Sequence, residues 1–154
     1  MVRYLITAAI VMLAGHAAAQ EAETPDTIAD AYLAAYQAQD FDALAGWIAA
    51  DAVFIDPTSE AVPGIAEPFH WTGRDAILAG MRSWGASRLE YEIDRRYSAS
   101  GHVIFDGAVA AIYETPDGVT AYRYPIITIL TIADGQVSEH RDYTDFSGMT
   151  QEAR

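Results

Sequence analysis

The sequence predicts an α+β domain in which helices pack on one face of a curved antiparallel sheet. In the first half of the chain, apolar residues recur at steps of three and four, which is typical of amphipathic helices. From Leu89 onward, apolar and polar residues alternate, which is typical of strands with one face in water. Pro116-Asp117-Gly118 and Asp134-Gly135 interrupt this alternation and favour tight turns between antiparallel strands.

Residues 1–19 resemble an export signal and are excluded from the predicted domain. Arg3 precedes a mostly apolar run, Tyr4–Gly15, and Ala17-Ala18-Ala19 fits a cleavage site of small residues. The run is shorter than the ~20 apolar residues that cross a bilayer as a helix, so we expect no membrane anchor. We therefore expect an exported protein, periplasmic or secreted, with a single domain over residues 20–154.

The chain is strongly acidic and has no cysteine. Its 22 Asp and Glu residues against nine Lys and Arg residues give a formal net charge of -13. Such a charge repels phosphate groups, so nucleic acid is not an expected partner. Without cysteine, the core must be held by packing alone, although an oxidising compartment would permit disulfides.

Two helices are predicted before the first strand. Thr24-Pro25-Asp26 supplies a hydroxyl cap, a proline at the first helical position and an early acidic residue. The apolar stripe that follows puts Tyr32 and Tyr36 on the buried face of a helix of about four turns. A new stripe after Gln39-Asp40 predicts a short second helix. It consists of Phe41, Leu44, Trp47 and Ile48.

The remaining elements are one strand, a loop, a third helix and four strands. Residues 52–56 predict the first strand, and the loop Pro57–Trp71 follows it. Thr72-Gly73-Arg74-Asp75 resembles a capping box and begins the third helix. The apolar stripe of this helix is formed by Ile77, Met81 and Trp84. The later strands are predicted over residues 89–94, 103–114, 119–133 and 136–143.

Asp56 is the one carboxylate in the otherwise apolar segment Phe54-Ile55-Asp56-Pro57. Burying an ionised carboxylate without a partner costs several kcal/mol, so such a group is paired, neutralised or directed at a ligand. Two interpretations remain open. Asp56 is a base on a pocket wall, or it caps the loop that begins at Pro57 and faces water.

Three segments of the chain resemble the amino-terminal half of the nuclear transport factor 2-like (NTF2-like) superfamily, and in particular the ketosteroid isomerases. They are Tyr-Leu-Ala-Ala-Tyr-Gln-Ala-Gln-Asp-Phe at 32–41, Trp-Ile-Ala-Ala-Asp-Ala-Val-Phe-Ile-Asp-Pro at 47–57, and Thr-Gly-Arg-Asp-Ala-Ile at 72–77. The resemblance covers nearly all of residues 25–146. It implies a cone-shaped sheet around a pocket for a small apolar or aromatic molecule, and a homodimer.

The resemblance also implies roles for two residues. Asp56 takes the place of the aspartate base of the isomerases, and Tyr32 that of the tyrosine that donates a hydrogen bond to the enolate oxygen. The isomerases carry a second acid in this oxyanion hole. Its place falls near Pro125-Ile126-Ile127, where this sequence has isoleucine at both candidate positions.

The motif His140-Arg141-Asp142-Tyr143-Thr144-Asp145 resembles the last strand of limonene epoxide hydrolases and of SnoaL-like polyketide cyclases. Asp142 takes the place of the water-activating aspartate of the hydrolases. The period of two puts His140 on the same strand face as Asp142. The hydrolases also need an Arg and an Asp on an earlier strand, where this sequence has Val109 and Ala111.

Several other side chains are candidates for the pocket wall. They are Tyr36, Trp47, Phe54, His70, Trp71, Trp84, Tyr113, Tyr124, Ile126 and His140. Most of them would be core residues in any fold, and the same alternative applies to Tyr32. His70 has a second interpretation as an exposed loop residue, and Asp142 as the partner of Arg123 or Arg141 in an ion pair.

Motifs for cofactors are absent from the sequence. The histidines lack the short spacing of a metal site, and glycine-rich phosphate loops and serine-nucleophile elbows are missing. We therefore expect neither a metal nor a cofactor. Two functions stay open: an enzyme that moves protons on an apolar carbonyl compound or epoxide through Asp56, Asp142 and Tyr32, and a non-catalytic ligand-binding or dimerisation module.

Overall fold

The computed structural model describes residues 23–62 and 64–153, and the predicted elements appear in the predicted order, together with two short strands that were not predicted, over residues 69–72 and 150–153. The helices are α1 (Pro25–Ala38), α2 (Phe41–Trp47) and α3 (Arg74–Ser83). The strands are β1 (Ile48–Asp56), β2 (Phe69–Thr72), β3 (Arg88–Ala99), β4 (His102–Thr115), β5 (Gly118–Ala133), β6 (Gln136–Thr144) and β7 (Thr150–Ala153). Two 3-10 turns, η1 (Pro57–Ala61) and η2 (Phe146–Gly148), follow β1 and β6. The predicted export signal, residues 1–19, lies outside the described residues.

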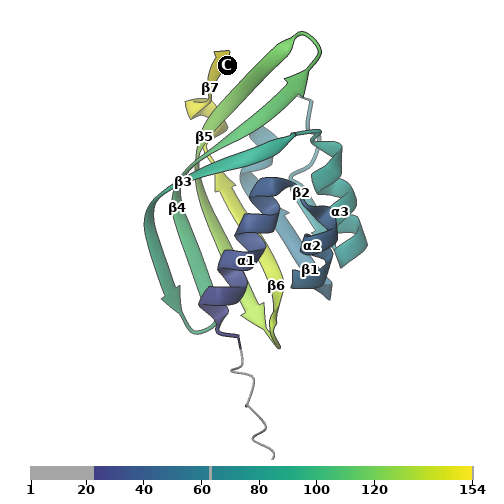
Figure 1. Cartoon of the computed structure of the whole chain (residues 1–154), viewed down its shortest axis with the longest axis vertical. Helices are drawn as coiled ribbons and strands as arrows, with labels where there is room; N and C mark the ends of the chain where they lie inside the picture. Colours follow the sequence, from purple (N-terminus) through teal and green to yellow (C-terminus); the bar gives the residue numbers. More distant parts are fainter. Residues whose placement is uncertain (1–22, 63, 154) are drawn as a thin grey trace, which may run out of the picture.

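All strands belong to one strongly curved sheet, and the three helices lie on the same side of it (Figure 1). The strand order is β2-β1-β6-β5-β4-β3, with β7 paired to β5. Strands β3 to β6 form the predicted antiparallel meander. Strands β1 and β6 run parallel, so the sheet is mixed. The predicted α+β class, with helices on one face of a curved sheet, is confirmed.

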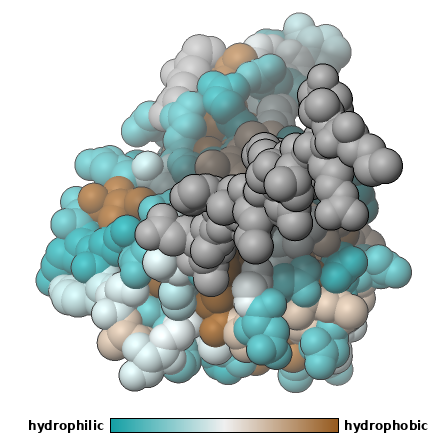
Figure 2. Space-filling model, turned by 60° about the horizontal axis from the view of Figure 1, so that its bottom comes forward, coloured by the Kyte–Doolittle hydropathy of each residue, from teal (hydrophilic) through white to brown (hydrophobic). Residues whose placement is uncertain are grey.

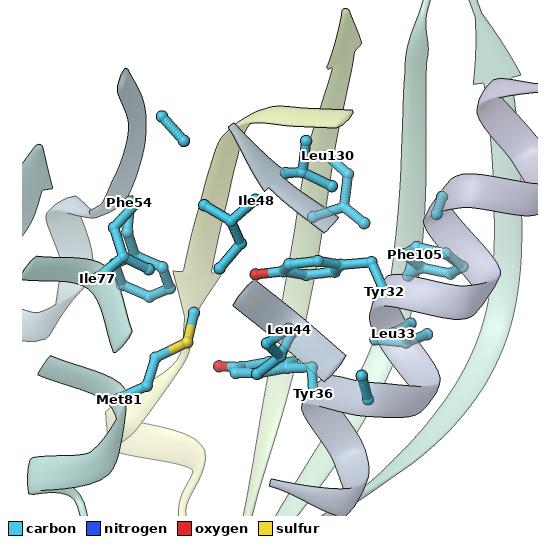
Figure 3. Packing of buried hydrophobic residues seen from close by; sticks show 14 of the residues in the cluster. Tyr32, Leu33, Tyr36, Leu44, Ile48, Phe54, Ile77, Met81, Phe105 and Leu130 are labelled. Carbon is cyan, nitrogen blue, oxygen red and sulfur yellow. The ribbon is translucent and has the colours of Figure 1, made fainter. Parts of the chain in front are cut away.

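Helix α1 begins as the sequence predicts and supplies much of the core. The hydroxyl oxygen of Thr24 accepts a hydrogen bond from the backbone N–H of Thr27 at 3.2 Å. Tyr32 and Tyr36 project from α1 in the same direction, across the space between the helices and the sheet (Figure 3). Their rings stack at a centroid distance of 6.1 Å, and both side chains are buried.

The first strand begins earlier than predicted. Helix α2 ends at Trp47, and β1 starts at Ile48 rather than at Ala52. Ile48 is buried and pairs with Val137 of the parallel strand β6. The sequence places Ile48 in phase with the helical stripe, but this pairing with a distant strand overrides the local pattern.

Two short elements lie in the segment predicted as the loop Pro57–Trp71. Residues 57–61 form the turn η1, and Phe69 begins β2, which pairs antiparallel with β1. Thr72 therefore ends a strand and is not a helix cap. The chain enters α3 through Gly73 at φ 90°, and no side chain caps this helix. A capping box is wrong here because Thr72 is held in the ladder opposite Val53.

On the face that Figure 2 shows, the coloured residues are mostly hydrophilic, with separate hydrophobic areas. The large apolar side chains that are exposed are Ile93, Tyr97, Ile127, Tyr143 and Met149. Within residues 23–62 and 64–153, none of the helices has the length and apolar character needed to cross a membrane.

Gly107 leaves less room for a side chain than the other described glycines, which generates a stability prediction. It lies on β4 opposite the irregularity of β3 between Ile93 and Arg95, and an added Cβ would overlap the carbonyl oxygen of Glu92. We expect Gly107→Ala to lower the free energy of unfolding by ~1–3 kcal/mol in urea titrations. Gly46→Ala in α2 is the control, because a Cβ there meets nothing within 4 Å. Equal stability of the two variants would contradict the prediction.

Candidate active site

A cavity of about 200 Å³ opens between α1, the carboxyl ends of β1 and β6, and the strands β3 to β5. Most of its lining is apolar or aromatic. The side chains predicted for the wall that do line it are Tyr36, Phe54, Trp84, Tyr113, Tyr124 and Ile126. Asp56 and Asp142 are the acidic side chains among the described lining residues. The structure therefore brings both predicted carboxylates to one apolar space.

Four other side chains predicted for the wall lie elsewhere. Trp71 stacks on Phe54 at a centroid distance of 4.9 Å and packs behind the wall. His70 is exposed, because the alternation along β2 turns it outward between Phe69 and Trp71. Trp47 packs against the core at the end of α2, and His140 is buried without lining the cavity.

His140 connects helix α1 to the carboxylate of Asp142. Its Nδ1 lies 2.7 Å from the hydroxyl oxygen of Tyr32, and its Nε2 lies 3.0 Å from Oδ1 of Asp142. The structure has no hydrogen bond between Nε2 and Asp142, and Nε2 has no other hydrogen-bond partner among the described residues, so the second contact is a close approach of a polar ring nitrogen to a carboxylate oxygen. All three residues are at most 3% exposed. Tyr32, predicted to face a ligand, instead bonds to this histidine and does not line the cavity.

The two carboxylate oxygens of Asp142 differ in their hydrogen bonding. The Thr128 hydroxyl donates to Oδ1 at 2.6 Å, and the Tyr91 hydroxyl lies 3.0 Å from the Thr128 hydroxyl. Because Thr128 uses its hydrogen on Asp142, Tyr91 is the donor in the second bond. Oδ2 of Asp142 takes no hydrogen bond from the described residues and is not fully enclosed, so it is open to the cavity that Asp142 lines.

Asp56 satisfies parts of both interpretations of the sequence. The backbone N–H and the hydroxyl of Thr58 donate to its Oδ1 at 2.9 and 2.5 Å, so it caps the turn η1. The Thr144 hydroxyl donates to Oδ2 at 3.1 Å. The residue is nevertheless only 4% exposed and lines the cavity. Asp56 is therefore a capping residue whose carboxylate does not face bulk water.

The comparisons with known proteins identify the family and the fold. The sequence matches the SnoaL-like domain over residues 29–140. The chain belongs to the SnoaL-like domain family. None of the curated proteins matches it. The predicted resemblance to the NTF2-like superfamily is thus confirmed at the level of the family and the fold.

Solved structures share the fold of this SnoaL-like protein. One, named as a SnoaL-like polyketide cyclase from Shewanella putrefaciens, is 19% identical with a TM-score of 0.68 and covers 94% of each chain. An epoxide hydrolase of Mycobacterium tuberculosis, described as "LEH-like", is 20% identical with a TM-score of 0.60, covering 80% of this chain and 84% of its own. A Catenulispora acidiphila protein with a ketosteroid isomerase-like fold, in complex with trimethylamine, is 21% identical with a TM-score of 0.60, covering 78% and 86%.

The SnoaL-like domain lacks side chains that two of the resembling families use. Val109 and Ala111 line the cavity where the hydrolases carry an Arg and an Asp. Ile126 lines it close to the place of the second isomerase acid, and Ile127 points outward. Among the described residues, no group of three or more His, Cys, Asp or Glu side chains is arranged to hold a metal ion.

Sequence reasoning missed four polar side chains of the site. They are Thr58, Tyr91, Thr128 and Thr144, which bond to the two carboxylates directly or through one hydroxyl. The alternation along β6 could have revealed Thr144, because it follows His140 and Asp142 on the same face. Thr58 lies two positions after Asp56, which is the spacing of an Asx turn.

The environment of the two carboxylates predicts an altered titration of Asp56. Burial raises the pKa of Asp56 above its ordinary value, the hydroxyl of Thr58 opposes this, and the charge of Asp142 raises the pKa further. We expect Asp142→Asn to lower the pKa of Asp56 towards the ordinary value of about 3.9, measured by carbon-13 NMR of the carboxyl groups. Asp51→Asn, at an exposed position of β1, should leave it unchanged.

The same shift fixes the sign of a stability effect. Because the folded-state pKa of Asp56 lies above the unfolded value, protonated Asp56 favours the folded state. This contribution is fully present below the unfolded pKa and is lost as the pH rises through the folded pKa. The titration prediction is contradicted if the pKa of Asp56 is the same in the wild type and in Asp142→Asn, because the two carboxylates then do not interact.

Proposed function

We propose that this SnoaL-like protein catalyses proton transfer on a small apolar molecule that carries a carbonyl group or an epoxide. The observation that carries the proposal is the presence of two buried carboxylates, Asp56 and Asp142, on the wall of one apolar cavity. Carboxylates of this kind serve as general acids and bases when their environments differ.

The hydrogen bonds favour Asp142 as the base. Its Oδ2 is free to accept a proton, whereas both oxygens of Asp56 accept hydrogen bonds from Thr58 and Thr144. The raised pKa of Asp56 suits a group that holds a proton and returns it. Asp56, expected from the sequence to be the base, is therefore proposed as the proton-holding partner.

Tyr32 and His140 are proposed as positioning residues. Neither lines the cavity. Tyr32 fixes the His140 ring, and Nε2 of that ring lies 3.0 Å from Oδ1 of Asp142, the oxygen that does not face the cavity. A hydrogen-bonded partner behind a reacting group fixes its orientation and lowers the cost of reaching the productive geometry.

The size and relatives of the site support a small organic substrate. A cavity of about 200 Å³ with a mostly apolar wall suits a compact molecule with few polar atoms. The structural neighbours include one protein named as a polyketide cyclase and one named as an epoxide hydrolase, and both names refer to organic substrates. We also propose that residues 1–19 direct export and that the protein forms a homodimer.

A second candidate function is the binding of an organic cation without catalysis. The described lining carries two carboxylates, several aromatic rings and no basic side chain. Aromatic faces and carboxylates together attract ammonium groups. A neighbour of the same fold was crystallised in complex with trimethylamine, which supports this candidate.

Removal of a proton from 5-nitrobenzisoxazole tests the first candidate. This small apolar probe loses a ring C–H proton to a base and opens to a coloured nitrophenolate. We expect the wild type to accelerate the reaction and Asp142→Asn to slow it about 10²-fold or more. The control Asp51→Asn keeps an exposed position and should match the wild type. Equal rates for the wild type and Asp142→Asn would contradict the role of Asp142.

Calorimetric titration with choline and with 3,3-dimethyl-1-butanol tests the second candidate. The two probes have the same shape, and only choline is charged. A cation site should bind choline about 10-fold or more tightly than the neutral probe, because aromatic and carboxylate contacts require the charge. Asp142→Asn should remove most of this preference. Equal affinity for both probes in the wild type would exclude a cation site.

A further inference from the structure

The buried tyrosines around the cavity differ in what their hydroxyl groups bind. The Tyr32 hydroxyl bonds to His140 at 2.7 Å, and the Tyr91 hydroxyl bonds to Thr128 at 3.0 Å. The Tyr36 hydroxyl has no hydrogen bond from the described residues, although this residue is only 2% exposed. Tyr36 lies one helical turn after Tyr32, and its ring is stacked on that of Tyr32 (Figure 3).

Among the described parts of the chain, the cavity that Tyr36 lines is a place from which its hydroxyl can receive a partner. Leaving a buried hydroxyl without a partner costs ~1–3 kcal/mol, so native structures rarely do so. Tyr36 lines the cavity, and its oxygen is not among the fully enclosed atoms that lack a partner. The unpaired hydroxyl therefore faces the space where a ligand would lie and is able to form a hydrogen bond with it.

The surroundings of Tyr36 make its hydroxyl a donor. Burial raises the pKa of Tyr36, and the nearby Tyr91 and the charges of Asp142 and Asp56 raise it further. The phenol consequently keeps its proton at neutral pH. Oδ2 of Asp142 is an acceptor in the same cavity, so the wall presents a donor at Tyr36 and an acceptor at Asp142 to a ligand.

We propose that the Tyr36 hydroxyl donates a hydrogen bond to the carbonyl oxygen of a ligand whose neighbouring carbon gives its proton to Asp142. The ligand class is a small ketone or related carbonyl compound with an acidic C–H bond. This assignment rests on the proton-transfer function proposed above for Asp142. It makes Tyr36 a catalytic residue and leaves Tyr32 as a positioning residue.

The chemical step balances without any further reactant. The C–H bond next to the carbonyl breaks, and its proton goes to Oδ2 of Asp142. The electron pair of that bond forms a C=C bond, and the π pair of the carbonyl moves onto the oxygen to give an enolate. The Tyr36 hydrogen bond strengthens as this negative charge develops on the oxygen, which stabilises the transition state. The proton then returns to a carbon of the same molecule.

Binding of cyclohexanone and of methylenecyclohexane measures the Tyr36 hydrogen bond directly. The two probes differ in one group, an acceptor oxygen against a CH₂ group. In the wild type we expect the ketone to bind about 5- to 10-fold more tightly than the alkene. In Tyr36→Phe this ratio should fall to about one. The carbon-13 shift of labelled, bound ketone should change in the same variant.

One control variant and one activity measurement separate the outcomes. Tyr97→Phe, on the exposed part of β3, should match the wild type. If Tyr36→Phe does not fold, the wild-type ratio decides.

A ratio near one in the wild type, no ketone binding, or a ratio unchanged in Tyr36→Phe overturns the assignment. These binding results are independent of turnover. If the ratio falls in Tyr36→Phe while Asp142→Asn leaves proton removal from 5-nitrobenzisoxazole unchanged, the donor role of Tyr36 stands and the proposed proton transfer fails.

Discussion

The hydrogen bond between the Tyr32 hydroxyl and the His140 ring is the constraint on which the rest of the site depends. It joins α1 to β6 across 108 positions of the chain, inside a core that excludes water from both side chains. In such surroundings each polar atom needs a partner, because leaving one unpaired costs more than the bond contributes. The His140 ring, fixed on one side by Tyr32, meets Asp142 on the other. The position of a buried helix thereby fixes the ring that lies against a carboxylate on the sheet.

The two carboxylates of the cavity differ because the fold satisfies them differently. Asp56 closes the end of β1, accepts bonds from Thr58 and Thr144, and has a pKa that burial raises. Asp142 is supported from behind by Thr128 and His140 and leaves one oxygen towards the cavity. A purely structural acid would have both oxygens paired, as Asp56 has. The asymmetry is therefore the physical argument for chemistry at Asp142 and for a supporting role at Asp56.

Local patterns in the sequence predicted most helices and strands and the faces that point inward. Strand boundaries and the partners of the buried polar side chains depend on contacts between distant parts of the chain. The period of two placed His140 and Asp142 together, because alternation is local. The early start of β1 at Ile48 and the strand at His70 both depend on pairing with other strands, which no local pattern reveals. Tyr32 and Tyr36 share one helix face. Which of them reaches the cavity is decided by His140, so the sequence could not distinguish the positioning tyrosine from the one that faces the ligand space.

Nitrogen-15 NMR of the His140 ring tests this account most directly. If His140 supports the carboxylate of Asp142, its Nε2 must carry a proton, because a carboxylate oxygen only accepts. The account predicts a protonated Nε2 at neutral pH and an Nδ1 signal that changes in Tyr32→Phe but not in Tyr97→Phe. A bare Nε2 would place two acceptors 3.0 Å apart. That result would contradict the claim that α1 orients Asp142 through His140.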